Sequence, residues 1–414
     1  MPVLCVEHVS RDLFSFFSPD WDSCTFLLRH EISEKDFTEF DSVICSDSNQ
    51  IVSLCDSPIF DVKILYDLLG QRTDSFLDLV PEDDIYRHLS KKLDAHLKSF
   101  QVVSVDTSCF DFRFLFVDQD FLNQLFKRKS QLLIDLFEKA KQQDILDFYA
   151  EFFKFVRILY GKICNKELTI QDKQLDSWIN FNATGSKDGR LSCRRGFLNI
   201  FSLPKEQRKF ILSSSGYRFV QFDFKSFQPR IAIFSTNDES FKRRFSSVND
   251  IYSTGLLSRA DQKLNFFRVM FGVEPSNDSS LKPIFDLRTS IFKEATKKGK
   301  IKNLFGRMIW YNGEEENVVF RNWIASCEAD FVFRVVVKLN DLLNGLRSRI
   351  KFPFHDALIF EIHEQEIFLL KQIKHVMEDS FIDSIFFTRF PVKIQFGENF
   401  GELHDLSARE SVTQ

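Results

Sequence analysis

The sequence predicts an α/β (α+β) protein with a small N-terminal α/β unit, a helical segment, and a longer region in which strands and helices alternate. Three observations lead to this fold class. Short apolar runs between turn signals fill residues 1–118, apolar positions recur at helical spacing in residues 119–180, and strand and helix patterns alternate in residues 181–404. Residues 405–414 are predicted to form a C-terminal tail.

The helical segment is predicted to contain long helices with a break near Gln142–Asp144. Its apolar positions follow the period of one helix face. They are Leu132, Leu136, Ile145, Phe148, Phe152, Phe155 and Leu159.

The region after residue 181 is predicted to contain five further elements. Tyr217–Phe224 alternates as a strand does, with Asp223 on the same face as Tyr217 and Gln221. The others are a helix at Asp261–Gly272 that ends at a glycine, a tight hairpin at Phe352–Ile362 with His355 and Asp356 near its turn, an amphipathic helix at Glu364–Phe381, and a strand at Val392–Phe396.

Charge is distributed unevenly along the chain, although the net charge is only −4. Residues 1–120 hold 23 acidic and 10 basic side chains, whereas the remaining 294 residues hold 36 and 45. Basic side chains gather in residues 187–209, seven against two acidic, and in residues 259–307, 11 against 5. The basic part is therefore suited to a phosphate backbone, and the acidic N-terminal unit is better suited to a protein partner.

Composition excludes several classes of protein. The eight cysteines form no C-x-x-C pair, so a zinc ribbon is not expected. No apolar run is long enough to cross a bilayer and no signal peptide follows Met1, so we expect a soluble, cytoplasmic protein without a membrane partner. Most of the 50 phenylalanines are predicted to fill the core, and a few could stack on bases.

Two aspartates stand in apolar strand contexts. Asp223 ends one strand pattern, and Asp356 lies in the hairpin. Side by side, the two carboxylates would repel each other unless divalent cations compensated them. Mg²⁺ takes oxygen ligands and shares them with substrate phosphates, as two-metal phosphoryl transfer requires. The alternative is two ordinary turn aspartates.

A stripe of four side chains runs along the helix predicted at Asp261–Gly272. Arg259, Lys263, Phe267 and Phe271 recur every fourth residue, so they share one face. Cations at the N-terminal end suit a triphosphate, and the rings suit its base. An amphipathic helix with a basic end is the alternative.

A loop at Asn182–Ser192 contains Gly185, Gly189 and Arg190. Glycine lets a backbone approach a ligand closely, and arginine can reach a phosphate or a base edge. An ordinary surface loop is the alternative.

In this order, the pieces resemble the motifs of family A DNA polymerases, the group of bacterial DNA polymerase I. Asp223–Arg230 resembles motif A, D-Y-S-Q-I-E-x-R; Arg259, Lys263, Phe267, Phe271 and Gly272 match motif B, R-x3-K-x3-F-x3-Y-G; and His355-Asp356-Ala357 resembles motif C, H-D-E. Smaller matches are Thr184-Gly185 with Gly189-Arg190-Leu191-Ser192 to T-G-R-L-S-S, Asn199-Ile200 to Asn-Ile, Asp250-Ile251-Tyr252 to D-I-H, Phe305-Gly306-Arg307 to x-G-R, and Gly397–His404 to G-E-N-W. The resemblance covers roughly residues 176–404.

The resemblance implies a right-hand polymerase fold. An antiparallel-sheet palm in residues 181–404 would carry trimmed fingers at about residues 240–305, and residues 119–180 would form a helical thumb. The activity implied is that of a template-directed DNA polymerase in DNA replication or repair. A virus or a plasmid is one genetic element that could encode such a chain. It would extend a primer 3′ end by two-metal phosphoryl transfer and release pyrophosphate. Its partners would be primer-template DNA and deoxynucleoside triphosphates, and its cofactors two Mg²⁺ ions, which Mn²⁺ can replace.

The resemblance also implies roles for single residues. Asp223 and Asp356 would hold the metals, and Arg259 and Lys263 would bind the triphosphate. The other nucleotide-binding residues would be Phe267, Phe271, Gln228 and Tyr252, and the primer- or template-binding residues would be Arg190, Arg230, His355 and Arg307.

Several positions depart from the family pattern. Gln228 replaces the motif A Glu, Phe271 the motif B Tyr, Ala357 the motif C Glu, and Tyr252 the His of D-I-H. In the family, that Glu closes the pocket beside the sugar 2′ position and is held by the Tyr hydroxyl. The chain is therefore expected to accept ribonucleotides more readily, unless Gln228 finds another anchor. No residue in 321–330 matches the Gln of the family's N-x-x-x-Q segment.

The N-terminal unit, residues 1–118, faintly resembles a proofreading exonuclease at Phe60–Leu65. That chemistry needs a D-x-E for its own metal pair, and residues 1–120 contain none. A vestigial or purely structural domain without proofreading is expected.

Three other activities stay open: a single-subunit RNA polymerase, a template-independent nucleotidyltransferase, and a non-catalytic nucleic-acid-binding protein on the same scaffold. The first is disfavoured by length, and the last by the joint retention of Asp223, Asp356, Arg259 and Lys263.

Overall fold

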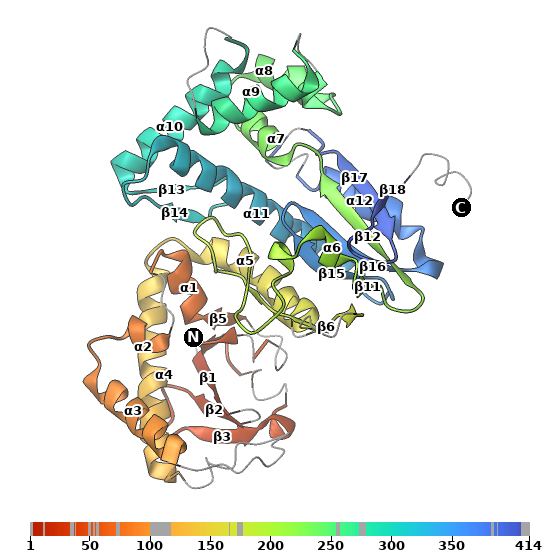
Figure 1. Ribbon diagram of the computed structural model, residues 1–414. Helices are drawn as coiled ribbons and strands as arrows, with labels where there is room; N and C mark the ends of the chain where they lie inside the picture. The colour runs from red at the N-terminus through yellow and green to blue at the C-terminus, as the bar shows by residue number, and fades with distance from the viewer. Residues whose placement is uncertain are drawn as a thin grey trace. The chain divides into compact units, whose positions relative to one another are not determined.

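The contacts of the computed structural model divide the chain into two compact units, Met1–Tyr149 and Ala150–Gln414. Each unit is described by itself, and both are drawn in Figure 1. The structure describes residues 3–10, 13–33, 37, 39–48, 51–52, 54, 58–71, 75–99, 117–164, 166–171, 177–253, 257–272, 279–381, 385–386 and 388–406.

A mixed sheet forms the centre of the first unit, with strand order β3-β2-β1-β4-β5. Its strands are β1 (Val3–Ser10), β2 (Leu13–Phe17), β3 (Thr25–Leu28), β4 (Ser42–Cys45) and β5 (Ile59–Asp61). Strand β1 pairs antiparallel with β2 and parallel with β4, and β4 pairs parallel with β5. Leu4, Val43 and Ile44 are fully buried in its core.

The helices of this unit are α1 (Val62–Leu68), α2 (Phe76–Leu79), α3 (Asp84–Ser99) and α4 (Gln119–Lys141), and a 3₁₀ turn, η1 (Arg29–Glu31), follows β3. Helices α1 and α4 pack on the sheet, and α3 packs on α4. Asp118 begins α4 because its carboxylate accepts a hydrogen bond from the Phe121 amide at 2.8 Å. Helix α4 then packs on β1, β4, α1 and α3. Because of these contacts, α4 belongs to the first compact unit, which extends to Tyr149. The sequence predicts a domain boundary after residue 118. A thumb formed by residues 119–180 stays a prediction.

The break predicted near Gln142–Asp144 is confirmed. Helix α4 ends at Lys141, Asp144 has a φ of 52°, and α5 (Leu146–Ile158) follows and continues into a π-helical turn, η5 (Leu159–Ile163).

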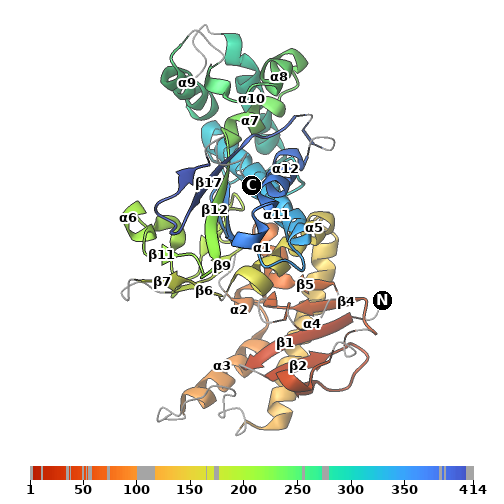
Figure 2. The ribbon, with the colours of Figure 1, turned by 90° about the vertical axis from the view of Figure 1, so that its right-hand side faces the viewer.

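An antiparallel sheet forms the centre of the second unit, with strand order β15-β16-β12-β17-β18. Its strands are β12 (Tyr217–Phe224), β15 (Arg349–Phe354), β16 (Ala357–His363), β17 (Val392–Gly397) and β18 (His404–Asp405). Helices α11 (Glu316–Leu342) and α12 (Leu369–Asp379) pack against each other and against β15 and β17, respectively. Figure 2 shows both helices beside β12 and β17.

Helices inserted between β12 and α11 gather beyond one end of β12 (Figures 1 and 2). They are α7 (Phe227–Phe234), α8 (Glu239–Ser246), η7 (Ile251–Ser253), α9 (Arg259–Phe271), η8 (Ser279–Leu281) and α10 (Lys282–Lys298), followed by the hairpin β13 (Lys300–Lys302) and β14 (Met308–Trp310). Helix α9 packs on α7, α10 and α11. The insertion is therefore joined to the sheet through α7 and α11.

Short ribbons precede β12 in the chain. They comprise β6 (Lys166–Glu167), β7 (Thr169–Ile170), β8 (Trp178–Ile179), β9 (Phe181–Asn182), β10 (Ser192–Cys193), η6 (Ile200–Ser202), α6 (Lys205–Arg208) and β11 (Ile211–Leu212). Strand β10 pairs with β9, β11 with β7, and β6 with β8.

Most elements predicted after residue 181 are confirmed. Strand β12 has the predicted bounds, β17 extends one residue further, and the hairpin turns at His355–Asp356. Helix α9 begins two residues earlier than predicted because Ser258 caps it. The Ser258 hydroxyl accepts a hydrogen bond from the Asp261 amide at 3.2 Å and donates one to the Asp261 carboxylate at 2.6 Å. The helix predicted at Glu364–Phe381 is shorter, since a 3₁₀ turn, η9 (Glu364–Glu366), precedes α12.

Among the helices that the structure describes, none combines the length and the apolar character needed to cross a membrane.

Candidate active site

Strand β12 positions Asp223 at one end of the central sheet. Side chains alternate along β12, so the half-buried Asp223 stands between the buried Phe222 and Phe224. In the antiparallel pairing with β16, Asp223 lies opposite Ala357, the residue directly after Asp356. The register therefore makes the two aspartates neighbours.

The backbone around the two aspartates adopts an unusual conformation. His355, directly before Asp356, has a φ of 54°, and Ser226, three residues after Asp223, has a φ of 53°. Among the described residues other than glycine, only Asp144 shares a positive φ with these two. Conformations of this kind are costly for residues with a side chain and collect at functional sites.

The aspartate pair carries negative charge that the protein compensates only in part. Burial, and then the charge of Asp356, raise the pKa of Asp223 to about 7, against a smaller opposing effect of Lys393. Burial likewise raises the pKa of Asp356, although His355 and Arg190 act against this. A shared site for two carboxylates is favoured when a cation lies between them.

The donor set fits a divalent cation of the Mg²⁺ type, because it consists of carboxylate oxygens. Within the described ranges, no group of three or more His, Cys, Asp or Glu side chains could hold a metal.

A third buried carboxylate, Glu328, belongs to the same region. It lies in the buried middle of α11 with 4% of its surface exposed. Its Oε2 accepts a hydrogen bond from Nε2 of Gln228 at 2.6 Å, and its Oε1 lies 3.6 Å from Nη2 of Arg190. Burial raises the pKa of Glu328 to about 7, opposed by Arg190 and reinforced by Asp356. Gln228 thus has the anchor that the sequence left as the alternative.

The sequence offered a signal for Glu328 that the motif comparison missed. Glu328 and Asp330 interrupt the apolar run of α11, whose neighbouring residues are almost all buried. Charged residues inside such a run must be paired or functional.

Arg190 lies in the loop between β9 and β10, with 41% of its side chain exposed. Ser186 organises this loop, because its hydroxyl hydrogen-bonds to Asp188 and to the Arg190 carbonyl oxygen, the latter at 2.8 Å. Asp188 Oδ2 also lies 3.7 Å from Nη1 of Arg190. The loop therefore presents Arg190 toward Glu328, near Asp356, and leaves it partly open to a ligand.

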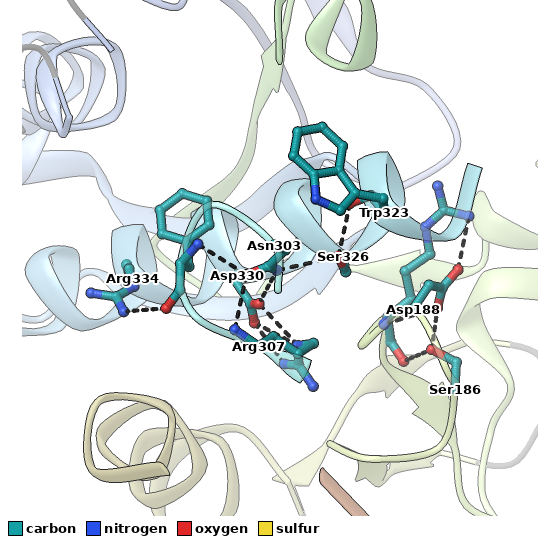
Figure 3. Close-up of polar contacts among 10 residues, drawn as sticks. Ser186, Asp188, Asn303, Arg307, Trp323, Ser326, Asp330 and Arg334 are labelled. Carbon is teal, nitrogen blue, oxygen red and sulfur yellow. Dashed lines mark hydrogen bonds and ion pairs between the residues drawn. The ribbon is translucent and has the colours of Figure 1, made fainter. Parts of the chain in front are cut away.

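Arg307, which the resemblance assigned to primer or template binding, is buried in the structure. Its side chain is 4% exposed and forms a two-pronged ion pair with Asp330, with Nη2 to Oδ1 at 2.6 Å and Nε to Oδ2 at 2.9 Å. Asn303 donates to the same carboxylate at 2.6 Å, as Figure 3 shows. Arg307 thus supplies the countercharge of the buried Asp330.

The loop glycines serve internal packing, where the sequence suggested approach to a ligand. A Cβ at Gly189, whose φ is +77°, would come within 2.7 Å of the Arg307 guanidinium carbon. A Cβ at Gly185 would come within 1.9 Å of the Ser192 hydroxyl. Gly189 thus lets the Arg190 loop rest on the buried Arg307–Asp330 pair.

Arg230, which the resemblance also assigned to primer or template binding, is held by backbone carbonyl groups. It is fully buried in α7, and its guanidinium donates to the carbonyl oxygens of Lys225, Val248 and Asn249 at 3.1, 2.6 and 2.9 Å. Burial lowers its pKa to about 10. The residue ties the start of α7 to the segment before η7.

Arg259 and Tyr252 meet at the N-terminal end of α9. The Arg259 side chain is 62% exposed, and its Nε donates to Asp250 at 2.6 Å. Its guanidinium lies over the Tyr252 ring, 5.5 Å from the centroid. Tyr252 itself is 3% exposed. A phosphate could therefore reach Arg259, whereas the buried Tyr252 ring packs against the Arg259 guanidinium.

The predicted stripe on α9 is present. Lys263 is exposed and lies 6.0 Å from the Phe267 ring centroid, and the Phe267 and Phe271 centroids are 5.9 Å apart. Both rings are partly exposed. Cations and aromatic faces thus follow one another along one side of the helix, as triphosphate and base binding require.

Aromatic and basic side chains also surround His355. The His355 ring lies 5.4 Å from that of Phe201 and 4.6 Å from that of Phe354. The Arg208 guanidinium covers Phe354 at 4.7 Å. Together with the exposed His355, this cluster adjoins Asp356 and offers stacking surfaces and charge, which suit a nucleic-acid strand.

In the first unit, Asp61 is engaged by the protein backbone. Its carboxylate accepts from the amides of Ser48 at 2.6 Å and Ile64 at 3.0 Å, so it caps α1. Burial raises its pKa to about 7. Both oxygens serve the fold, which favours a structural role over a metal site.

No family model matches the chain. Among solved structures, the chain is similar to the POL domain of Pol1 from M. smegmatis, solved in complex with DNA primer-template and dNTP, at a TM-score of 0.48 and 17% identity. The alignment covers 82% of this chain and 64% of that chain, so less than two thirds of that protein domain is matched. A likeness of this size assigns neither a family nor an activity to the chain.

Proposed function

We propose that this chain is a template-directed DNA polymerase that adds deoxynucleotides to a primer 3′ end without proofreading. The observation that carries the proposal is the pair Asp223 and Asp356. Asp223 lies near the end of β12, and Asp356 lies in the turn directly before β16, the strand that pairs antiparallel with β12. Burial, and then the charge of Asp356, raise the pKa of Asp223, and both side chains offer only oxygen ligands. The exposed cationic and aromatic stripe on α9 and the cluster around His355 support it.

Asp223 and Asp356 would hold the divalent cations. Two Mg²⁺ ions, or Mn²⁺, would activate the attacking 3′-hydroxyl and stabilise the leaving pyrophosphate. Arg259 and Lys263 would bind the triphosphate, with Arg259 exchanging its contact with Asp250 for phosphate oxygens. Phe267 would stack near the incoming base, with Phe271 next to it along the stripe.

The primer end would lie along the His355 cluster. Arg190 is partly exposed and near Asp356, so its side chain can contact the terminal phosphate or base while the backbone of its loop stays in place. His355 and Phe201 offer ring faces beside the same carboxylate. Arg230 and Arg307 act indirectly, because they hold the elements that carry these groups.

Primer extension tests the proposal. The purified chain is incubated with a labelled primer, with and without template, with dNTPs or NTPs, and with Mg²⁺ or Mn²⁺. Extension is expected to need template and metal. Asp356→Asn should abolish extension while folding and DNA binding stay largely intact, since only the ligand charge is lost. Extension by that variant at the wild-type rate would refute the site.

A matched control is Asp286→Asn, which changes an exposed carboxylate on α10 paired with Lys282. It should extend primers as the wild type does. Extension without template would indicate terminal transfer, a preference for NTPs an RNA polymerase, and DNA binding without extension a non-catalytic scaffold.

A further inference from the structure

Glu328 is a buried carboxylate that the proposed reaction does not use. The neighbouring carboxylate on α11, Asp330, forms the ion pair with Arg307. Glu328 instead holds Gln228 by a hydrogen bond of 2.6 Å and lies 3.6 Å from a nitrogen of Arg190. One carboxylate thus joins α7, α11 and the Arg190 loop beside the aspartate pair.

The chemistry of this contact explains why residue 228 is an amide. A carboxylate only accepts hydrogen bonds when ionised, whereas the Gln228 amide nitrogen donates. A second carboxylate at position 228 would face Glu328 in a buried place already close to Asp356, and like charges there are strongly unfavourable. Gln228 and Glu328 are therefore chemically matched to each other.

The position of Gln228 connects this contact to the substrate. Gln228 lies in the first turn of α7, five residues after Asp223, and α7 packs on α9, which carries the stripe. A nucleotide with its phosphates at the aspartates and Lys263 and its base at Phe267 would place its sugar near the start of α7. The Gln228 carboxamide would then border that sugar.

We propose that Glu328 is a positioning residue of the nucleotide pocket, which fixes the Gln228 carboxamide and thereby determines which sugar the pocket accepts. This inference rests on the proposed function. Without the acceptor on α11, the carboxamide is free to change rotamer and the pocket beside the sugar widens.

The test compares kcat/KM for a dNTP and its NTP in primer extension. Glu328→Ala should lower this ratio at least about tenfold, since the anchor is lost. Glu328→Gln retains a carbonyl oxygen that can accept from Gln228, so it should keep the ratio within about threefold of wild type. A purely structural residue would change stability and leave the ratio as it was, and that result would overturn the proposal.

A second arm measures the contact itself by thermal unfolding. Gln228→Glu should lower Tm because it opposes two carboxylates, and adding Glu328→Gln to it should restore most of the loss, since the pair is again one amide and one carboxylate. Additive effects of the two changes would overturn the pairing. This arm also serves if Glu328→Ala fails to fold.

Glu361→Gln is the matched control, because Glu361 is a fully buried carboxylate on β16 paired with Lys351 and Arg349. It should lower Tm without moving the sugar ratio, and a matching fall in its ratio would overturn a specific role for Glu328. If wild type extends no primer, the proposed function fails and the positioning role fails with it. The Tm comparison would still report whether Gln228 and Glu328 pair.

Discussion

Replacing Asp330 by Asn should destabilise the second unit by about 3–5 kcal/mol, the usual result of leaving one member of a buried ion pair without its countercharge. The Asp330 and Arg307 side chains are 2% and 4% exposed, so water cannot take over from the lost carboxylate. Asn retains the volume of Asp and an oxygen that can accept from Asn303, but its amide nitrogen replaces an oxygen that accepts from Arg307, so the change removes the charge and one acceptor of the guanidinium.

A loss of this size corresponds to a fall in Tm of roughly 6–20 °C for a unit of this length. Circular dichroism during heating measures it. Two controls separate the causes. Asp286→Asn removes an exposed pairing and should cost about 0.5 kcal/mol or less. Adding Arg307→Met to Asp330→Asn should recover most of the loss, because no unpaired charge stays buried. A Tm for Asp330→Asn within about 2 °C of wild type would refute the reasoning.

Three further predictions concern the proposed activity. Lys263→Ala should weaken nucleotide use by roughly 1.5–3 kcal/mol while DNA binding changes little, and the reverse pattern in KM and DNA affinity would reassign Lys263 to the nucleic-acid backbone. A mismatched primer incubated with Mg²⁺ and no nucleotides should keep its terminal base, since Asp61 is engaged by two amides; steady loss that Asp61→Ala abolishes would reveal an exonuclease. Phe271→Tyr alone should leave the ratio of dNTP to NTP use unchanged, because Gln228 already has Glu328 as its anchor, and a marked rise in that ratio would contradict this.

The elements that position the aspartates could be predicted from sequence because their signals are local. The alternation in Tyr217–Phe224, the short turn at His355–Asp356 and the fourfold spacing on α9 each lie within a few turns or strand residues. The order of these motifs along the chain then indicated that Asp223 and Asp356 belong together.

Burial and partners could not be predicted in the same way, since they depend on residues far apart in the chain. Arg230 and Arg307 look like surface cations in the sequence, yet both are enclosed by the fold. The anchor of Gln228 lies 100 positions away on α11. The family motifs connect Gln228 with Phe271, but no pattern in the sequence around Gln228 or Glu328 connects these two residues.

The contact between Gly189 and the Arg307 guanidinium has a genetic consequence. Position 189 has two independent reasons to exclude side chains, a left-handed backbone and a guanidinium 2.7 Å from where a Cβ would lie. In a library randomised at this codon, functional clones should retain glycine almost without exception. A second-site change at codon 307 should suppress an alanine there only in part, because it would make room for the extra methyl group but leave the left-handed backbone strain.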